Sequence, residues 1–153
     1  MTDESILEQI QLDMTAAMKA RDAGTLSTLR MLKAALIEVR TKKAKDAAFS
    51  RDDEIAVLQH YAKKRRETIE ELRKIGREDL VASEEREIAV TQRYLPQMLS
   101  EDEVRALVLE AVAKTGAASP RDLGKVMCAV MAQVKGRADG ALVSRLVKGA
   151  LGG

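Results

Sequence analysis

The chain has few of the residues from which catalytic and metal sites are built. It contains one cysteine, one histidine, two prolines, no tryptophan, two tyrosines and one phenylalanine. One histidine and one cysteine supply neither a catalytic triad nor the ligands of a His/Cys zinc site. No Walker-type loop and no Gly-x-Gly-x-x-Gly motif is present to hold a nucleotide. We therefore expect no independent catalytic activity, no catalytic residues, no metal and no cofactor.

Long hydrophobic runs and targeting signals are also missing. No apolar run approaches the roughly 20 residues of a membrane-spanning helix. The chain opens with Thr2, Asp3 and Glu4 instead of a basic and then apolar signal segment. A lone Cys128 excludes an intramolecular disulfide framework and fits a reducing compartment. These features predict a cytoplasmic protein without a membrane partner.

Helix-forming and charged side chains are what the chain has in abundance. Of its 153 residues, 46% are hydrophobic and 33% are charged, and Ala, Leu, Glu, Lys and Arg dominate. A chain of this length buries a core without disulfides or metals. The net charge is only +2, and the excess of basic residues lies after Leu99. Composition therefore predicts an all-α protein with a slightly basic C-terminal third.

Four amphipathic helices are expected before Pro96. The first opens with a capping box at Ser5 and Glu8 and is expected to end near Gly24. The next three are expected over residues 25–45, 50–75 and 78–94, and Gly76 follows the third as a C-terminal cap. The apolar positions that support the first two helices are Ile6, Ile10, Met14, Met18, Leu29, Leu32, Leu36 and Val39.

A domain boundary is expected at residues 95–100, where a helix ends before Pro96 and a new capping box begins. Ser100 and Glu103 form that box. We therefore divide the chain into an N-terminal helical domain, 1–96, and a C-terminal domain, 97–153, with three short helices. Gly116, Ser119 with Pro120, and Asp139 mark the limits of these helices.

Two features of the predicted helices concern small or charged residues on apolar faces. Gly124 and Cys128 are four residues apart, and we expect this pair to mark a close helix contact with a buried thiol. The run 63–66 (KKRR) covers most of a helix circumference, so that Arg65 must face the apolar seam. Its guanidinium then has to find a carboxylate or bridge two segments, and a structural role is favoured over an RNA or partner contact.

A second basic cluster lies between the last two predicted helices. Residues 135–140 (KGRADG) place Lys135, Gly136 and Arg137 before the helix that Asp139 caps. The simpler interpretation of this cluster is a turn between two helices. The alternative is an anion site at the helix start, in which Lys125 and Lys148 extend a basic face.

Five short segments, in this order, resemble the YqeY family over nearly the whole chain. They are residues 29–35 (LRMLKAA), 76–80 (GREDL), 94–96 (YLP), 123–127 (LGKVM) and 135–140 (KGRADG). The C-terminal third is similar to the tail domain of GatB, a subunit of the amidotransferase that acts on Glu-tRNA and Asp-tRNA, and to modules appended to some glutaminyl-tRNA synthetases. That resemblance implies a three-helix C-terminal bundle and an association with tRNA.

The resemblance implies binding without catalysis. Amidation takes place in a catalytic body that this chain lacks, so that carbon-nitrogen ligase activity with glutamine as the donor belongs to relatives of the module. We expect a tRNA-binding or amidotransferase-related accessory module, with tRNA, an amidotransferase or an aminoacyl-tRNA synthetase as partner. The expected RNA-binding residues are Lys125, Lys135, Gly136, Arg137 and Lys148. A helical protein–protein interaction adaptor is the alternative, and residues Lys63, Lys64 and Arg66 are the alternative RNA site.

Overall fold

The computed structural model describes residues 5–152, which form seven α-helices, one 3-10 turn and no strand. The all-α prediction is confirmed. In chain order the elements are α1 (Ile6–Lys19), α2 (Ala23–Lys42), α3 (Arg51–Lys74), α4 (Glu78–Gln92), α5 (Glu101–Thr115), η1 (Pro120–Asp122), α6 (Leu123–Val134) and α7 (Gly140–Ala150).

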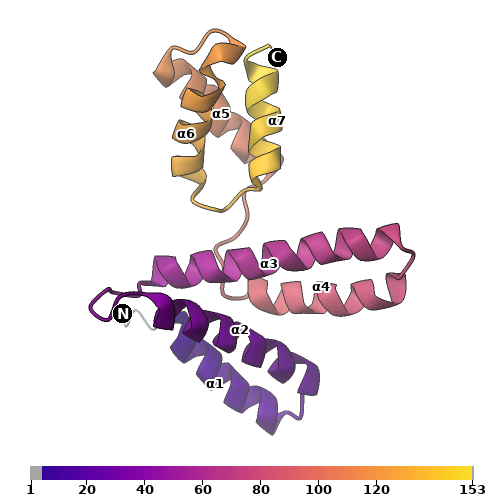
Figure 1. Ribbon diagram of the computed structural model, residues 1–153. Helices are drawn as coiled ribbons and strands as arrows, with labels where there is room; N and C mark the ends of the chain where they lie inside the picture. The colour runs from indigo at the N-terminus through magenta and orange to yellow at the C-terminus, as the bar shows by residue number, and fades with distance from the viewer. Residues whose placement is uncertain (1–4, 153) are drawn as a thin grey trace. The chain divides into compact units, whose positions relative to one another are not determined.

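The helices form two compact units, Met1–Leu95 and Pro96–Gly153. In the N-terminal unit α1 lies beside α2 and α3 lies beside α4, while α2 also packs on α3 (Figure 1). In the C-terminal unit α5, α6 and α7 each pack against the other two, with α6 and α7 running in opposite directions (Figure 1). Each unit is thus a helical bundle with a core of its own.

The two cores differ in side-chain type. Leucine and isoleucine fill the N-terminal core, where Leu29, Leu32, Leu36 and Leu58 are fully buried. Valine fills the C-terminal core at four-residue spacing, and its fully buried members are Val104, Val108, Val126, Val130, Val134, Val143 and Val147. Burying each such side chain contributes about 1.5–3 kcal/mol, so that regular valine spacing on three short helices accounts for the bundle.

The predicted helix starts are confirmed at three capping boxes. Ser5 with Glu8, Ser50 with Asp53, and Ser100 with Glu103 each exchange two hydrogen bonds between side chain and backbone. Each box satisfies amides that the first turn of a helix leaves without partners. At the other end of α3, Gly76 adopts a φ of 73°, as its predicted capping role requires.

A buried carboxylate ties α3 to the start of α1. Glu54 is 2% exposed. Its Oε1 accepts a hydrogen bond from the Ile6 amide at 3.0 Å, and its Oε2 accepts one from the Leu7 amide at 2.8 Å. The positive end of the α1 dipole adds to this interaction. Glu54 therefore fixes where α1 begins relative to α3.

Arg65 links α3 to α4, as its place on the apolar seam predicted. Its guanidinium lies 3.6 Å from a carboxylate oxygen of Glu84 and 3.9 Å from one of Glu87, and it stacks 5.2 Å from the Tyr61 ring centroid. The Tyr61 hydroxyl donates to Glu87 at 3.3 Å. Burial, and then repulsion from Glu87, raises the pKa of Glu84. Arg65 is a structural bridge between these two helices.

The first two helices begin and end at other residues than the sequence predicted. α1 ends at Lys19, because the chain turns through Arg21, which has a left-handed φ of 57°. Gly24 lies inside the first turn of α2, whose start Asp22 caps through the Thr25 amide. α2 ends at Lys42 because Lys43 is already extended.

Two predicted apolar positions in these helices are exposed. Met18 is 58% exposed, and Ala17 is buried in its place. A strict four-residue spacing advances by 40° at each step of a helix with 100° per residue, so that Met18 has rotated away from the face of Ile6. Val39 is 38% exposed, although Leu36 one turn earlier is fully buried.

The expectation of a close contact at Gly124 and Cys128 is wrong. Cys128 is exposed, and a Cβ placed on Gly124 would meet no atom within 4 Å. The buried face of α6 runs through Val126 and Val130. Cys128 lies 200° around the helix from both, so that its thiol faces outward.

Replacing Glu54 tests its role in holding α1. Glu54→Ala leaves two amides without acceptors in a buried position, and we expect it to lower the free energy of unfolding by about 2–3 kcal/mol. The measurement is urea unfolding followed by tyrosine fluorescence, because Tyr61 and Tyr94 both lie in the N-terminal unit. Asp52→Ala, at the exposed neighbour of Asp53, is the control. Equal losses from the two variants would contradict the role of Glu54.

Candidate functional site

The five residues predicted to bind RNA fall at two ends of the α6–α7 hairpin. Lys135, Gly136 and Arg137 lie together in the loop that joins the two helices. Lys125 lies in the first turn of α6 and Lys148 near the end of α7, about 15 Å along the helices from that loop. The structure therefore separates the predicted set into two groups.

Arg137 is a structural residue of the loop. Its Nε donates to the Gln97 carbonyl at 2.9 Å, its amide donates to the Val134 carbonyl at 2.8 Å, and its own carbonyl accepts from the Leu99 amide at 2.7 Å. These bonds hold the segment before α5 against the loop after α6. Part of the guanidinium of Arg137 is thus already occupied by the protein.

The start of α7 is occupied by its own cap. Asp139 accepts a hydrogen bond from the Ala141 amide at 3.0 Å. A carboxylate at this position repels a second anion and satisfies an amide that the anion would need. The geometry therefore favours the interhelix turn over an anion site at the amides of α7.

The acidic side chains of residues 96–152 are all engaged within the C-terminal unit. Three accept hydrogen bonds from backbone amides. Glu103 and Asp139 do so at helix starts, from the Ser100 and Ala141 amides, and Asp122 accepts from the Ala118 amide in the turn before η1. The other three pair with cations, Glu101 with Arg145 and Arg105, Asp102 with Arg105, and Glu110 with Lys114. No carboxylate in this described part of the chain is left to neutralise further lysines.

Four cations of the same range make no hydrogen bond or ion pair. They are Arg121, Lys125, Lys135 and Lys148, and all four are exposed. Arg121 and Lys125 flank the start of α6, and the antiparallel hairpin brings the end of α7, with Lys148, to that same end (Figure 1). Arg121 was not among the RNA-binding residues expected from the sequence. Its position four residues before Lys125 was the available signal.

The exposed side of α7 carries a shallow hollow. The hollow has a volume of about 570 Å³ and is lined by Ala141, Ser144, Arg145, Lys148 and Gly149. Its small residues leave the helix backbone open to close approach, and its two basic residues stand beside them. This arrangement suits a chain of phosphates better than a compact uncharged ligand.

Two other kinds of site were sought in residues 5–152. None of the helices there is long and apolar enough to span a bilayer. No group of three or more His, Cys, Asp or Glu side chains in that range is placed to hold a metal ion.

Comparison with known proteins shows what the chain is similar to. The family model described as "Yqey-like protein" matches residues 7–151. The mitochondrial "Altered inheritance of mitochondria protein 41" of Pyrenophora tritici-repentis (strain Pt-1C-BFP) is 32% identical over 151 residues, which cover 96% of this chain and 81% of that relative. The relative's name places that protein in mitochondria, and a cytoplasmic location for this chain stays a prediction.

Replacing Arg137 and Lys135 separates a structural role from an electrostatic one. Arg137→Ala removes the bond to Gln97, which is worth about 1 kcal/mol, and should raise the hydrogen-exchange rate of the Leu99 amide roughly fivefold. Lys135→Ala removes an unpaired charge and should leave that rate unchanged. Amide exchange followed by NMR on the whole chain makes the comparison. Equal exchange in both variants would show that Arg137 does not hold the segment.

Proposed function

The chain belongs to the YqeY family, and on that premise we propose that it is a non-catalytic tRNA-binding module whose C-terminal unit contacts phosphates. The observation that carries the proposal is the charge arrangement of residues 96–152. Every acidic side chain there accepts a backbone hydrogen bond or pairs with a cation, and Arg121, Lys125, Lys135 and Lys148 keep their charges available. Free cations on an otherwise neutralised surface attract a polyanion.

The expected mode of RNA binding follows from the lack of aromatic side chains in the C-terminal unit. Phe49, Tyr61 and Tyr94 are the aromatic residues of the chain, and none belongs to the C-terminal unit. Bases therefore find no aromatic side chain to stack on there. Binding runs through phosphates and the shape of a folded RNA, which fix orientation and carry little sequence information.

The choice of tRNA among folded RNAs rests on resemblance. The C-terminal third is similar to the GatB tail domain, and modules of that kind are associated with tRNA recognition. An amidotransferase or an aminoacyl-tRNA synthetase is accordingly the protein that would share the bound tRNA. The chain itself supplies no nucleophile with a base and no nucleotide loop, so its role is to bind.

The structure changes which residues are expected to carry the binding. Lys125, Lys148 and Arg121 form the main group because they are unpaired and lie at one end of the α6–α7 hairpin. Lys135 contributes charge from the other end. Arg137 and Gly136 act chiefly by shaping the loop, since Arg137 is bonded to Gln97 and Gly136 adopts a φ of 79°.

Salt dependence tests the proposal. Binding of fluorescein-labelled tRNA to the whole chain is measured by anisotropy across a salt series, with a duplex RNA for comparison. Lys125→Ala and Lys148→Ala should each lower the magnitude of the log-log salt slope by roughly 0.7–0.9, the value for one lost phosphate contact. The matched control is Lys114→Ala, because Lys114 already pairs with Glu110 at 2.7 Å.

Three results would contradict the proposal in different ways. Equal slopes for Lys114→Ala and Lys125→Ala would show that unpaired charge does not select the contacts. A loss of binding confined to Lys63→Ala and Arg66→Ala would move the RNA site to α3. Absence of binding to either RNA at low salt would leave the adaptor role.

A further inference from the structure

The N-terminal unit has an elongated groove between α2 and α3. The groove has a volume of about 560 Å³. One wall comes from the C-terminal half of α2, residues 35–43, and the other from residues 53–64 of α3. These stretches are about 12 Å and about 16 Å long at the rise of an α-helix. An occupant that fills the groove is therefore elongated, with the length of two to three helical turns.

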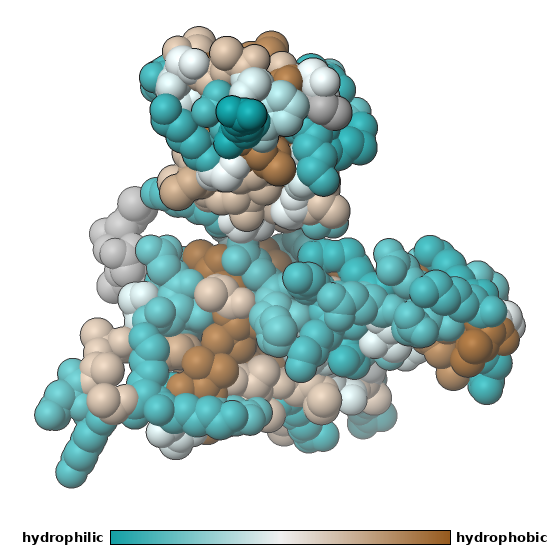
Figure 2. All heavy atoms as spheres, turned by 45° about the horizontal axis from the view of Figure 1, so that its top comes forward, coloured by the Kyte–Doolittle hydropathy of each residue, from teal (hydrophilic) through white to brown (hydrophobic). Residues whose placement is uncertain are grey.

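The floor of the groove is apolar. Val39 of α2 and Val57 of α3 face it, together with the ring of Tyr61. Val39 continues the stripe of Leu29, Leu32 and Leu36, which are fully buried, but is itself 38% exposed. Figure 2 shows hydrophobic surface between hydrophilic side chains on this unit. Burial raises the pKa of Tyr61 to about 12, so its hydroxyl is neutral. The α2 stripe thus extends past its own core into the groove.

Basic side chains form the rim of the groove. Lys64 and His60 of α3 line it, and neither side chain forms a hydrogen bond or ion pair with the described residues 5–152. Lys42 first, and Lys64 to a smaller extent, lower the pKa of the Glu38 carboxyl in the same groove. Lys42 of α2 pairs with Glu38 at 2.9 Å, but both side chains are exposed, 73% and 65%. Such a pair on a helix surface is weak, so a carboxylate of another molecule can compete for Lys42.

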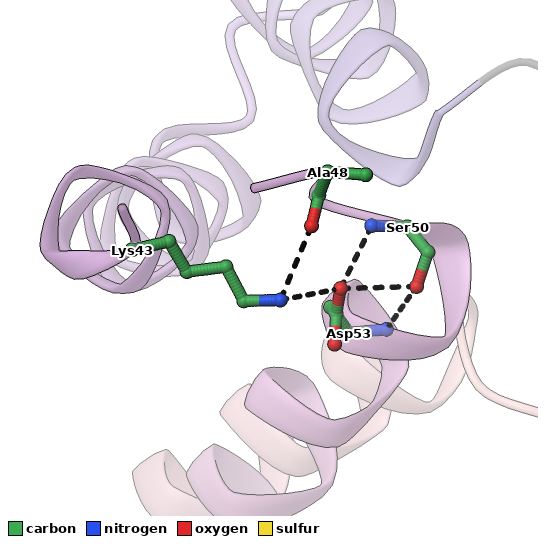
Figure 3. A network of polar contacts seen from close by, with 4 residues as sticks. All are labelled: Lys43, Ala48, Ser50 and Asp53. Atoms are coloured by element: carbon green, nitrogen blue, oxygen red, sulfur yellow. Dashed lines mark hydrogen bonds and ion pairs between the residues drawn. The ribbon is translucent and has the colours of Figure 1, made fainter. Parts of the chain in front are cut away.

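The remaining charged pair of the rim belongs to the protein's own structure. Lys43 donates to Asp53 at 2.8 Å and to the Ala48 carbonyl at 3.2 Å, and Asp53 also accepts from the Ser50 amide (Figure 3). Lys43, and then the Ser50 bonds, lower the pKa of Asp53 to about 2. This network closes one end of the groove. The charge left for an occupant is therefore positive.

We propose that the α2–α3 groove binds an acidic amphipathic helix of a partner protein. Apolar side chains of that helix, spaced at i, i+3 and i+7, cover Val39, Val57 and the Tyr61 ring. Its acidic flanks lie against Lys42 and Lys64. A helix between two helices is the packing that side-chain ridges and grooves favour. This site lies in the other unit from the proposed RNA contacts and does not depend on them.

A designed peptide tests the proposal on the whole chain. The probe is a fluorescein-labelled peptide of about 14 residues, four helical turns, with leucine at i, i+3, i+4 and i+7 spacing and glutamate elsewhere. One control peptide has lysine for every glutamate, and a second has the same composition in permuted order. Anisotropy should show about tenfold tighter binding of the acidic amphipathic peptide than of either control.

Two matched pairs of variants locate the binding. Val39→Ser should weaken it about tenfold, whereas Met31→Ser, also exposed on α2 but outside the groove, should not. Lys64→Ala should weaken it about threefold, the effect of an exposed ion pair, whereas its neighbour Lys63→Ala should not. Circular dichroism checks that the variants fold, which is expected because all four side chains are exposed.

Several outcomes would overturn the proposal. Equal binding of the acidic and control peptides would show that neither charge nor amphipathicity selects the occupant. Equal effects within either pair of variants would remove the binding from the groove. Self-association of the chain that Val39→Ser abolishes would assign the groove to a second copy, and displacement of the peptide by tRNA would assign it to RNA.

Discussion

The first turn of each α-helix presents backbone N–H groups that need acceptors, and short helices make this demand often. In this chain carboxylates and the hydroxyls of Ser5, Ser50 and Ser100 share it. Glu54 caps α1 from another helix, Asp22 caps α2, Asp53 and Glu103 complete capping boxes, and Asp139 caps α7. A carboxylate that bonds a helix start keeps its negative charge but forms no close ion pair with a lysine elsewhere on the surface, and this affects which lysines stay unpaired.

This requirement links the fold to the proposed binding surfaces. The sequence is almost neutral, yet the C-terminal unit has four unpaired cations. Two of its six acidic side chains serve helix starts, one accepts from the Ala118 amide and three are in ion pairs. In the N-terminal unit Asp53 serves the start of α3 and pairs with Lys43, so that Lys64 forms no close ion pair beside an apolar groove. Net charge alone suggested neither surface.

The features that could be predicted from the sequence are those that depend on near neighbours. Capping boxes join residues three apart, and the Arg65 bridge followed from four basic residues that cannot share one helix face. The bond from Glu54 to Ile6 joins residues 48 apart, and that from Arg137 to Gln97 joins residues 40 apart. Such pairs depend on how helices pack. The error at Cys128 has the same origin, because α6 is apolar on several faces and packing selects the one that Val126 and Val130 occupy.

The sequence named most of the basic residues of the candidate RNA site, but it did not predict which of them lie together. Lys125, Lys135 and Lys148 are exposed and unpaired, whereas Arg137 holds a loop and Arg121 joins the group at the start of α6. Counting charges along the sequence cannot separate a lysine that pairs with a carboxylate from one that does not. The spacing of charges on a helix does separate Lys114 from Lys125, because Glu110 stands four residues before Lys114, whereas Arg121 stands four residues before Lys125.

The central claim is that commitment of carboxylates to helix starts leaves the C-terminal unit as the surface that meets RNA. Chemical-shift mapping tests it directly, with the whole ¹⁵N-labelled chain titrated with tRNA at low salt. The account predicts that shifts concentrate on amides near Arg121, Lys125 and Lys148 and spare those near the paired Lys114. Shifts confined to residues 63–66 of α3, or spread equally around Lys114, would contradict it.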